Sequence, residues 1–386
     1  MTERAPGRYD GAVDESRARA LRWIAAGLGA LLLCFAAPAA PAVAGTTSYD
    51  VGDQAVVNVI VRGKGNDVTV RVWERPNVQL DFADDAAPQA ERHSVPFGTP
   101  RFPLSRQIPA MMFATRDRDG QVSAGALAPE EFPYAGFRPG AHDVVVVDAP
   151  DGSHLVVTVP ASTGLLSLRV GGGQTTIEGY RGANLFVVQG QGHVQLTGAT
   201  TTAFVQMNYG TFYAADSAFD RIRVRGIGAH DVFEHCRAKQ IEASSVHGSI
   251  VYDGGSFDPG LARFESQNGN IALGVNGGAS VTGRSQDGHV YTLFDRRGGT
   301  TVDQRGDGEA TATVGGGGPL VNAISGRGNV FLYDGTLQSR RAAAGPQWRA
   351  VHDVFAARRR GRNAGAAPRP ADAPRPGIPR PPRLRF

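Results

Sequence analysis

Between residues 159 and 336, short segments of alternating apolar and polar residues are separated by glycines at nearly equal spacing. Such alternation indicates β-strands, because successive side chains of a strand point to opposite faces. The spacings of 18 to 21 residues predict one repeated unit, in which a turn joins two short strands. The glycines that define this alignment are Gly173, Gly192, Gly210, Gly228, Gly248, Gly269, Gly288, Gly308 and Gly328.

The repeat predicts an inside and an outside. Residues two and four positions after each glycine are mostly apolar, as at Ile271 and Leu273, and we expect them to fill a core. The positions between them hold polar residues such as Asn270, which we expect to face outward. This alignment places His230 inside, in the column that holds Ile250.

Two folds fit short strands joined by glycine turns. An antiparallel meander is the competing fold, since Asn-Gly and Asp-Gly also form hairpin turns. Hairpin proteins vary their loops, whereas near-equal units fit a coil whose turns lie over one another. We therefore predict an all-β fold, a single-stranded parallel β-solenoid of about nine to ten rungs with a period of ~19–20 residues. Serines three residues before the glycine are expected to form an inner hydrogen-bonded ladder: Ser245, Ser266, Ser285 and Ser325.

Residues 1–44 have the order of a secretory signal peptide, with arginines, an apolar run and small residues ending at Ala44. An uncleaved membrane anchor is the alternative, although Pro38 and Pro41 interrupt the apolar span. After cleavage Cys236 is the only cysteine left, which excludes an intrachain disulfide.

The rest of the chain is predicted to have four parts. They are an N-terminal β region at 45–158 with an irregular insertion at about 83–142, the repeats at 159–336, a linker and capping helix at 337–360, and a disordered Pro/Arg-rich tail at 361–386. The helix is predicted from Trp348, Val351 and Phe355, which form one apolar face. A helix on a membrane surface or a partner is the alternative.

Charge separates the body from the tail. Residues 45–339 hold 23 Lys and Arg against 30 acids, whereas residues 340–386 hold 12 Arg against 2 acids. The body is therefore acidic, and the basic pI comes from the tail. We expect the tail to contact an anionic surface, and we expect no nucleic acid partner.

The segment "HDVFEHC" contains residue types that bind metals: His230, Asp231, Glu234, His235 and Cys236. A strand would distribute them over two faces, and no second Cys or His pair follows at a closing spacing. We therefore predict no metal site, no cofactor and no assigned catalytic residue.

Acidic and aromatic residues leave two alternatives each. An outward column of Asp253, Asp231 and Glu178, with the turn residues Asp287 and Asp307, could supply the paired carboxylates of a glycosidase. Turns also favour Asp for backbone reasons alone. Aromatic residues predicted to face outward are Tyr213, Phe233, Tyr291, Phe331 and Tyr333. They would form a platform for sugars or a partner, or a surface covered by the insertion or the tail helix.

Several phrases, "ESQNGNIALGV", "RSQDGHVYTL" and "VVQGQGHVQLTG", resemble the bacterial adhesin-like family described as "putative auto-transporter adhesin, head GIN domain", and its relatives of unknown function. The resemblance covers roughly residues 55–82 and 153–336. It implies a β-solenoid of the cell envelope and assigns no catalytic residue.

We therefore predict an exported protein that is periplasmic, associated with the outer envelope or secreted. Its expected role is non-catalytic binding, adhesion or scaffolding, with a glycan or another envelope component as partner. The alternative is a polysaccharide-active lyase or hydrolase that uses the outward carboxylates.

Overall fold

The computed structural model of the protein describes residues 45–82, 88–97, 115–116, 122–123, 140–294 and 299–335. All regular secondary structure in these residues is β-strand, which confirms the all-β class. No helix in this described part is long and apolar enough to cross a membrane. The predicted signal peptide, capping helix and Pro/Arg-rich tail lie outside the described residues.

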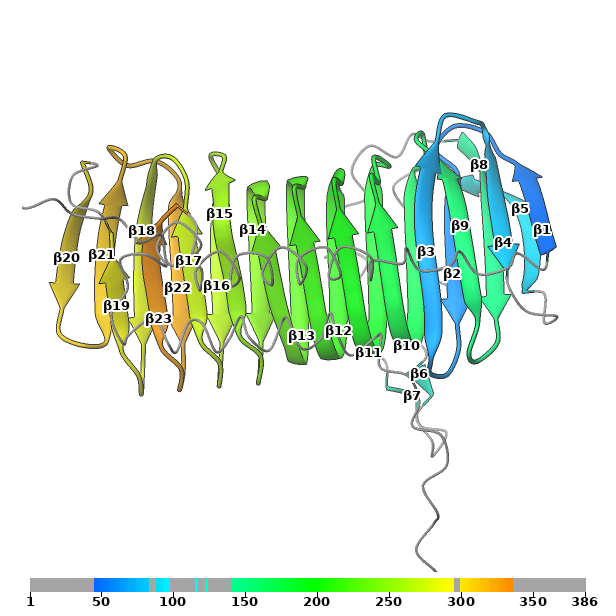
Figure 1. Ribbon diagram of the computed structural model, residues 1–386. Helices are drawn as coiled ribbons and strands as arrows, with labels where there is room; N and C mark the ends of the chain where they lie inside the picture. Colours follow the sequence, from blue (N-terminus) through cyan, green and yellow to red (C-terminus); the bar gives the residue numbers. More distant parts are fainter. Residues whose placement is uncertain are drawn as a thin grey trace, which may run out of the picture. The chain divides into compact units, whose positions relative to one another are not determined.

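From β8 onward most strands follow one another with short connections (Figure 1). The first nine are β1 (Gly45–Asp50), β2 (Val56–Val61), β3 (Asn66–Trp73), β4 (Asn77–Phe82), β5 (Gln89–Phe97), β6 (Thr115–Arg116), β7 (Val122–Ser123), β8 (Gly140–Ala149) and β9 (His154–Pro160). Four long strands come next: β10 (Leu165–Glu178), β11 (Asn184–Thr197), β12 (Thr200–Ala215) and β13 (Ala218–Glu234). The last ten are β14 (Arg237–Ser245), β15 (Ile250–Phe257), β16 (Leu261–Ser266), β17 (Ile271–Val275), β18 (Ala279–Ser285), β19 (Val290–Leu293), β20 (Thr301–Arg305), β21 (Glu309–Val314), β22 (Leu320–Ser325) and β23 (Val330–Asp334).

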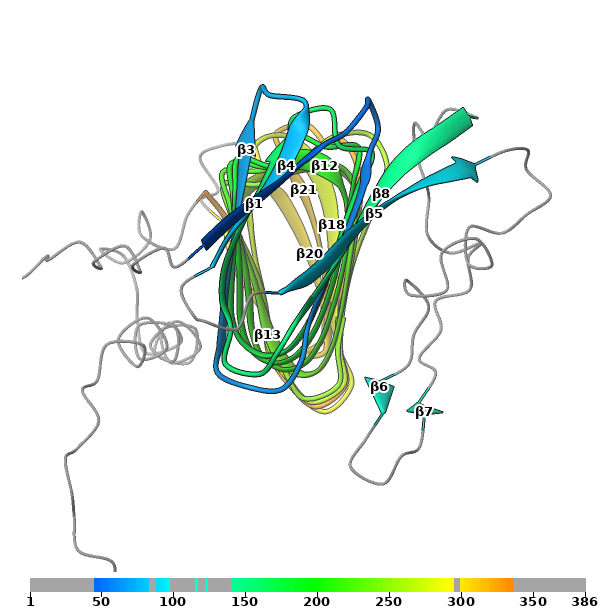
Figure 2. The same cartoon turned by 90° about the vertical axis from the view of Figure 1, so that its right-hand side faces the viewer.

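Successive turns of the chain, here called rungs, pair in parallel and build two walls around a common interior (Figure 2). Face A consists of β2, β8, β14, β16, β18, β22 and the first halves of β10 to β13. Face B consists of β3, β9, β15, β17, β19, β23 and the second halves of β10 to β13. Each rung thus contributes one strand segment to each face.

Glycines form the bend between the two faces because the rungs approach very closely there. Gly173, Gly192 and Gly210 have φ values of 132°, 110° and 126°. A Cβ atom on Gly192 would lie 1.9 Å from the carbonyl oxygen of Gly173 in the preceding rung. Only glycine combines this backbone conformation with this close approach.

Inward side chains from the two faces form one continuous core. Val57, Leu166 and Leu185 supply it from face A, and Ile177 and Leu196 from face B, all fully buried. These residues occupy alternate positions along their strands, as expected for a strand with one buried face. Burial of this apolar surface is the main term that stabilises the fold, since Cys236 is the only described cysteine and is unpaired.

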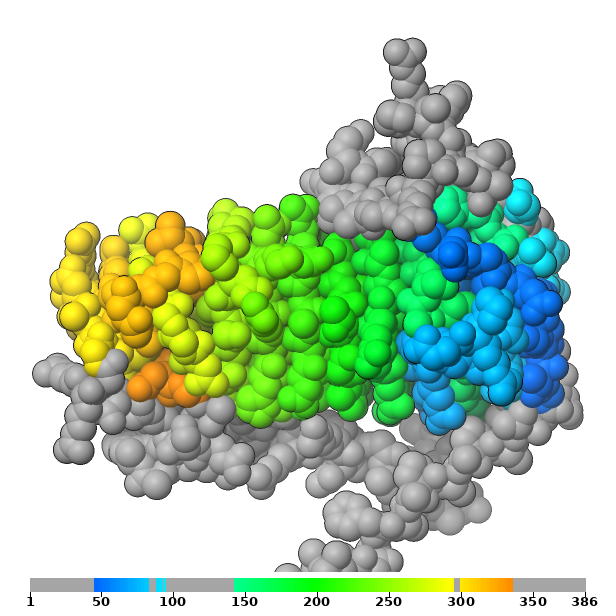
Figure 3. Space-filling view, turned by 90° about the horizontal axis from the view of Figure 1, so that it is seen from above, coloured from blue at the N-terminus to red at the C-terminus, as the bar shows by residue number. Residues whose placement is uncertain are grey.

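The order of rungs in space differs from their order in sequence at the C-terminal end. β22 lies between β16 and β18, and β23 lies between β17 and β19. Figure 3 shows the orange residues of this last rung flanked by yellow-green and yellow ones. The final rung is therefore inserted between two rungs that precede it in the chain.

The same arrangement occurs at the N-terminal end. β2 lies between β8 and β10, and β3 lies between β9 and β10. At both ends a segment of the chain passes over an intervening rung before it continues the stack. A repeat period alone cannot reveal this, because it gives the number of rungs and not their neighbours.

Antiparallel strands pair at both ends of the stack. β5 pairs with β8, and β1 pairs with β4, which pairs with β9. At the other end β18 pairs with β21, which pairs with β20. The prediction of a single, wholly parallel coil is therefore not confirmed, and Gly308 lies in the turn of a hairpin and not in a rung. Such reversals stop the parallel pairing that an open strand edge would otherwise continue.

The four predicted serines link successive rungs, but each donates to a backbone carbonyl, of Ala229, Gly248, Gly328 or Gly269, and not to another serine. Ser325 Oγ donates to Gly269 O at 2.9 Å, and the amide of Gly328 donates to Ser325 Oγ at 2.8 Å. Ser285 Oγ in turn donates to Gly328 O at 2.7 Å. Each hydroxyl therefore links its own bend to the bend of the next rung in space.

Candidate functional site

The strand that holds His230 and Asp231 is shifted by one residue from its predicted register. Gly210 pairs with Ala229, and not with Gly228, because the pairing of β12 with β13 is irregular between Thr201 and Ala203. A shift of one residue exchanges the two faces of a strand. Asp231 therefore points into the core, and the predicted inward position of His230 is wrong.

Asp231 occupies the inward column with Phe212 on one side and Ile250 on the other. It is fully buried, and neither carboxylate oxygen has a hydrogen-bond partner. Burial raises the pKa of Asp231 well above its usual value, so the carboxyl group is stabilised in its neutral form. His230 lies on the outer side, where it accepts a hydrogen bond from the Ser249 amide at 3.2 Å.

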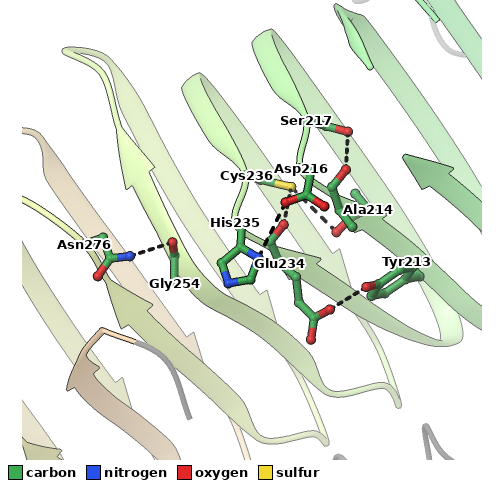
Figure 4. A network of polar contacts seen from close by, with 10 residues as sticks. Tyr213, Ala214, Asp216, Ser217, Glu234, His235, Cys236, Gly254 and Asn276 are labelled. Carbon is green, nitrogen blue, oxygen red and sulfur yellow. Dashed lines mark hydrogen bonds and ion pairs between the residues drawn. The ribbon is translucent and has the colours of Figure 1, made fainter. Parts of the chain in front are cut away.

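The other residues of "HDVFEHC" also point in different directions (Figure 4). Glu234 accepts a hydrogen bond from the Tyr213 hydroxyl. His235 Nδ1 lies 3.5 Å from Asp216 Oδ1 in an exposed turn. Cys236 is buried, and burial raises the pKa of its thiol to about 12. Within the described ranges, no three His, Cys, Asp or Glu side chains form a group that could hold a metal ion.

The predicted carboxylate column is broken, because Asp231 is inside while Asp253 and Glu178 face outward. Three rungs separate β10 from β15, which places Glu178 and Asp253 about 19 Å apart at the usual strand separation. Glycoside hydrolysis needs carboxyl groups about 5 to 9.5 Å apart. The predicted residues Glu178 and Asp253 therefore cannot act together as a glycosidase pair.

Two acidic turn residues keep their predicted exposed positions. Asp287 lies 3.9 Å from the guanidinium of Arg327. The backbone oxygen of Asp307 accepts a hydrogen bond from the Val290 amide at 2.7 Å, which brings the hairpin turn against the β18–β19 rung. Of the predicted carboxylates, Asp287 and Asp307 keep their places, and Glu234, which was not part of that prediction, lies in register beside Asp253 on the adjacent rung.

The outward aromatic prediction is correct for some residues and wrong for one. Phe233 lies in the core, as the shifted register requires. Tyr213, Tyr291, Phe331 and Tyr333 belong to a second cluster on the outer side of face B.

Face A carries a feature that the sequence analysis missed. One outward column runs through Asn58, Ser167, Phe186 and Phe204, which are in register on β2, β10, β11 and β12. All four are buried, although their strand neighbours Val57, Leu166, Leu185 and Ala203 are the residues that fill the core. We call these four residues the polar–aromatic site.

The polar half of this site has unsatisfied hydrogen-bonding groups. Neither Asn58 Nδ2 nor Asn58 Oδ1 has a partner, and Ser167 Oγ has none. Such a buried group costs about 1–3 kcal/mol when it is left unpaired. Two positions further along β10, burial lowers the pKa of the Arg169 guanidinium. The column thus presents an amide and a hydroxyl, with a cation beside them.

The aromatic half lies directly next to the polar half. The rings of Phe186 and Phe204 are stacked, with centroids 5.3 Å apart and planes 14° apart. The sequence signal was a small polar residue in the middle of an otherwise mostly apolar strand, as in "VVNVIV" and "LLSLRV". Asn58 lies before the glycine repeat, and the spacing of the glycines does not align it with Ser167.

Comparison with known proteins gives little further information. No family model matches the chain, and no curated protein matches it. A solved structure described as a "putative cell adhesion protein" from Clostridium sporogenes is similar at 5% sequence identity and a TM-score of 0.22. The match covers 75% of this chain and 99% of that one. A TM-score this low does not indicate a common fold, and the predicted adhesin-like family stays a prediction.

Proposed function

We propose that the protein is an exported β-solenoid of the cell envelope that binds carbohydrate at the polar–aromatic site without cleaving it. The observation that supports this proposal is the juxtaposition of Asn58 and Ser167, whose polar atoms are unpaired, with the stacked rings of Phe186 and Phe204.

A sugar ring matches both halves of the site. Its C–H face packs on aromatic rings, and its hydroxyl groups both donate and accept hydrogen bonds. The Asn58 amide offers a donor and an acceptor side by side, and Ser167 offers a hydroxyl group. The four side chains are at most 7% exposed, so binding requires that the atoms covering them move aside. A ligand that then satisfied the unpaired groups would recover the free energy lost by leaving them unpaired.

Binding without cleavage is favoured because the four residues of the site include no carboxylate. Glycoside hydrolysis uses a pair of carboxyl groups on either side of the scissile bond. Neighbouring positions of the column are Val146 on one side and Arg223 on the other. Arg223 is paired with Glu242, at 2.9 Å between Nε and Oε2, which directs that carboxylate to the guanidinium.

The test is binding of the purified full chain to a glycan array, followed by titration calorimetry with the glycans retained. We expect Asn58→Ala to weaken binding at least tenfold. Because Asn58 makes no hydrogen bond, this substitution should leave the free energy of unfolding unchanged or slightly increased. Thr282→Ala, on the outer side of β18 at the far end of face A, is the matched control and should bind normally. Failure to bind any glycan, or unchanged binding by Asn58→Ala, would contradict the proposal.

A further inference from the structure

The outer side of face B changes character along the stack. In β10 and β11 its residues are polar and at least partly exposed: Thr176, Glu178, Gln195 and Thr197. From β13 to β23 its residues are mostly apolar and no more than 5% exposed: Val232, Val251, Ala272, Phe331 and Tyr333. We call this second group the flank surface. Residues that point away from the core and yet are buried indicate that the surface is covered in the folded chain.

Acidic residues accompany the flank surface. Glu234 accepts the Tyr213 hydroxyl, and Asp253 accepts the Tyr333 hydroxyl at 3.0 Å. Asp334, the last residue of β23, is partly exposed at the same end of the strands. A segment that covers this surface should therefore combine an apolar stripe with positive charge.

The chain that follows β23 has this composition. Trp348, Val351 and Phe355 recur at spacings of three and four, and Arg358, Arg359 and Arg360 follow directly. Their order predicts a helix with one apolar side and a basic end. These residues lie outside the part of the chain that the structure describes.

Position and reach agree with the composition. β23, which carries Phe331 and Tyr333 of the flank surface, ends at Asp334, and Trp348 lies 14 positions further along the chain. An extended segment of this length spans up to about 46–50 Å. The strands of the flank surface, from β13 to β23, extend over about 14 Å at the usual separation. The linker can therefore place the helix over any part of this surface.

We propose that residues 346–361 dock on the flank surface, with the apolar stripe on Val251, Ala272 and Phe331 and the arginines next to Glu234 and Asp253. In this position the segment covers the side of the stack and does not cap its end. The end is already covered by the β20–β21 hairpin, which pairs with β18 through β21. This docking concerns face B and is independent of the carbohydrate site on face A.

Photo-crosslinking in the full chain tests the position of the segment. A photoreactive phenylalanine analogue replaces Phe355, and the crosslinked peptides are identified by mass spectrometry. We expect crosslinks to β15, β17 or β23 of the same chain. The same analogue in place of Ala357, on the opposite side of the helix, should give few of them. Crosslinks to β19 or β20 would assign the segment to the last rung, and crosslinks between chains would assign the surface to a second copy; either result overturns the proposal.

A substitution gives an independent measurement. Phe355→Glu should expose the flank surface and increase binding of an apolar fluorescent dye severalfold, whereas Ala357→Glu should not. Equal dye binding by both variants would contradict the docking. High salt should increase dye binding by the wild-type chain, because it screens the attraction between the arginines and the acids.

Discussion

The hydroxyl of Tyr333 donates a hydrogen bond to Asp253 Oδ1 at 3.0 Å across an intervening strand. β17 lies between β23 and β15, and the residue that the tyrosine ring crosses is Gly274. Burial raises the pKa of Tyr333 well above its usual value, and the negative charge of the nearby Asp253 raises it further. The hydroxyl therefore keeps its proton and remains a donor. One side chain thus connects three rungs on the flank surface.

Gly274→Ala is expected to destabilise the protein by about 1–3 kcal/mol, as overpacking does in well-packed sites. A Cβ atom at Gly274 would lie 2.3 Å from Cε2 of Tyr333 and would displace the ring. Urea denaturation measures the free energy of unfolding. Gly172→Ala is the control, because its Cβ atom would meet its nearest neighbour at 3.5 Å, an ordinary contact. An equal loss of unfolding free energy in the two variants would show that the position of the Tyr333 ring does not require glycine at residue 274.

The sequence predicts the β class, the period and the inner serines because these depend on local alternation and on turns that need glycine. It could not predict the neighbours of each rung. Ser325 seemed to return after a gap of one repeat, yet it lies directly between Ser266 and Ser285. The repeat at Gly308 that seemed to fill the gap is an antiparallel hairpin, since a single Asp-Gly turn fits either fold.

The candidate site was harder to predict, because one residue decides which face a side chain occupies. Alignment on Gly228 placed His230 inside, and the irregular pairing of β12 with β13 places Asp231 there instead. The polar–aromatic site joins Asn58 to Ser167, which are distant in sequence and adjacent only because the β2–β3 rung is inserted beside β10. No periodicity within the repeats contains that information.

Asp231 should make the stability of the protein depend on pH. Its pKa is raised in the folded chain, so below about pH 4 the carboxyl group is protonated in both states and contributes no difference. As pH rises further, the unfolded chain releases this proton while the folded chain retains it. The contribution of Asp231 to folding therefore becomes less favourable by up to about 1.4 kcal/mol per pH unit, until the folded pKa is reached.

Asp231→Asn removes this titration. We expect the variant to gain stability relative to the wild type between pH 4 and pH 7, with little difference at pH 4, in urea denaturation at each pH. Asp307→Asn, in an exposed turn, is the control and should show no such trend. A difference between Asp231→Asn and the wild type that is constant over this range would show that the buried carboxyl group does not titrate differently in the folded chain.

Ser325→Ala is expected to cost about 2–3 kcal/mol of unfolding free energy. The substitution leaves the Gly328 amide and the Gly269 carbonyl without the hydroxyl that joins them, in a position only 1% exposed. Ser244→Ala is the control, because Ser244 is partly exposed and its one contact, with Val224 O, is long at 3.5 Å. A loss below about 0.5 kcal/mol at Ser325, as is usual at the surface, would mean that water replaces the hydroxyl.

The turn that follows each face B segment needs a residue with a positive φ. Some rungs have glycine at this position, and others have a residue with a side chain. Gly179, Gly198, Asp216 and His235 have φ values of 63°, 65°, 50° and 50°, and the amide of each donates to a backbone carbonyl of the next rung. A residue with a Cβ atom pays about 1–2 kcal/mol for this conformation.

His235→Gly should therefore raise the free energy of unfolding by up to about 1 kcal/mol, because the flexibility that glycine adds to the unfolded chain offsets part of the gain. Gly198→Ala should lower it by a similar amount, although there is room for the added methyl group, whose closest neighbour would be Gly179 Cα at 4.0 Å. Thermal denaturation of the two variants should give shifts of opposite sign, and shifts of the same sign would show that side-chain contacts, and not the backbone conformation, determine the stability of these turns.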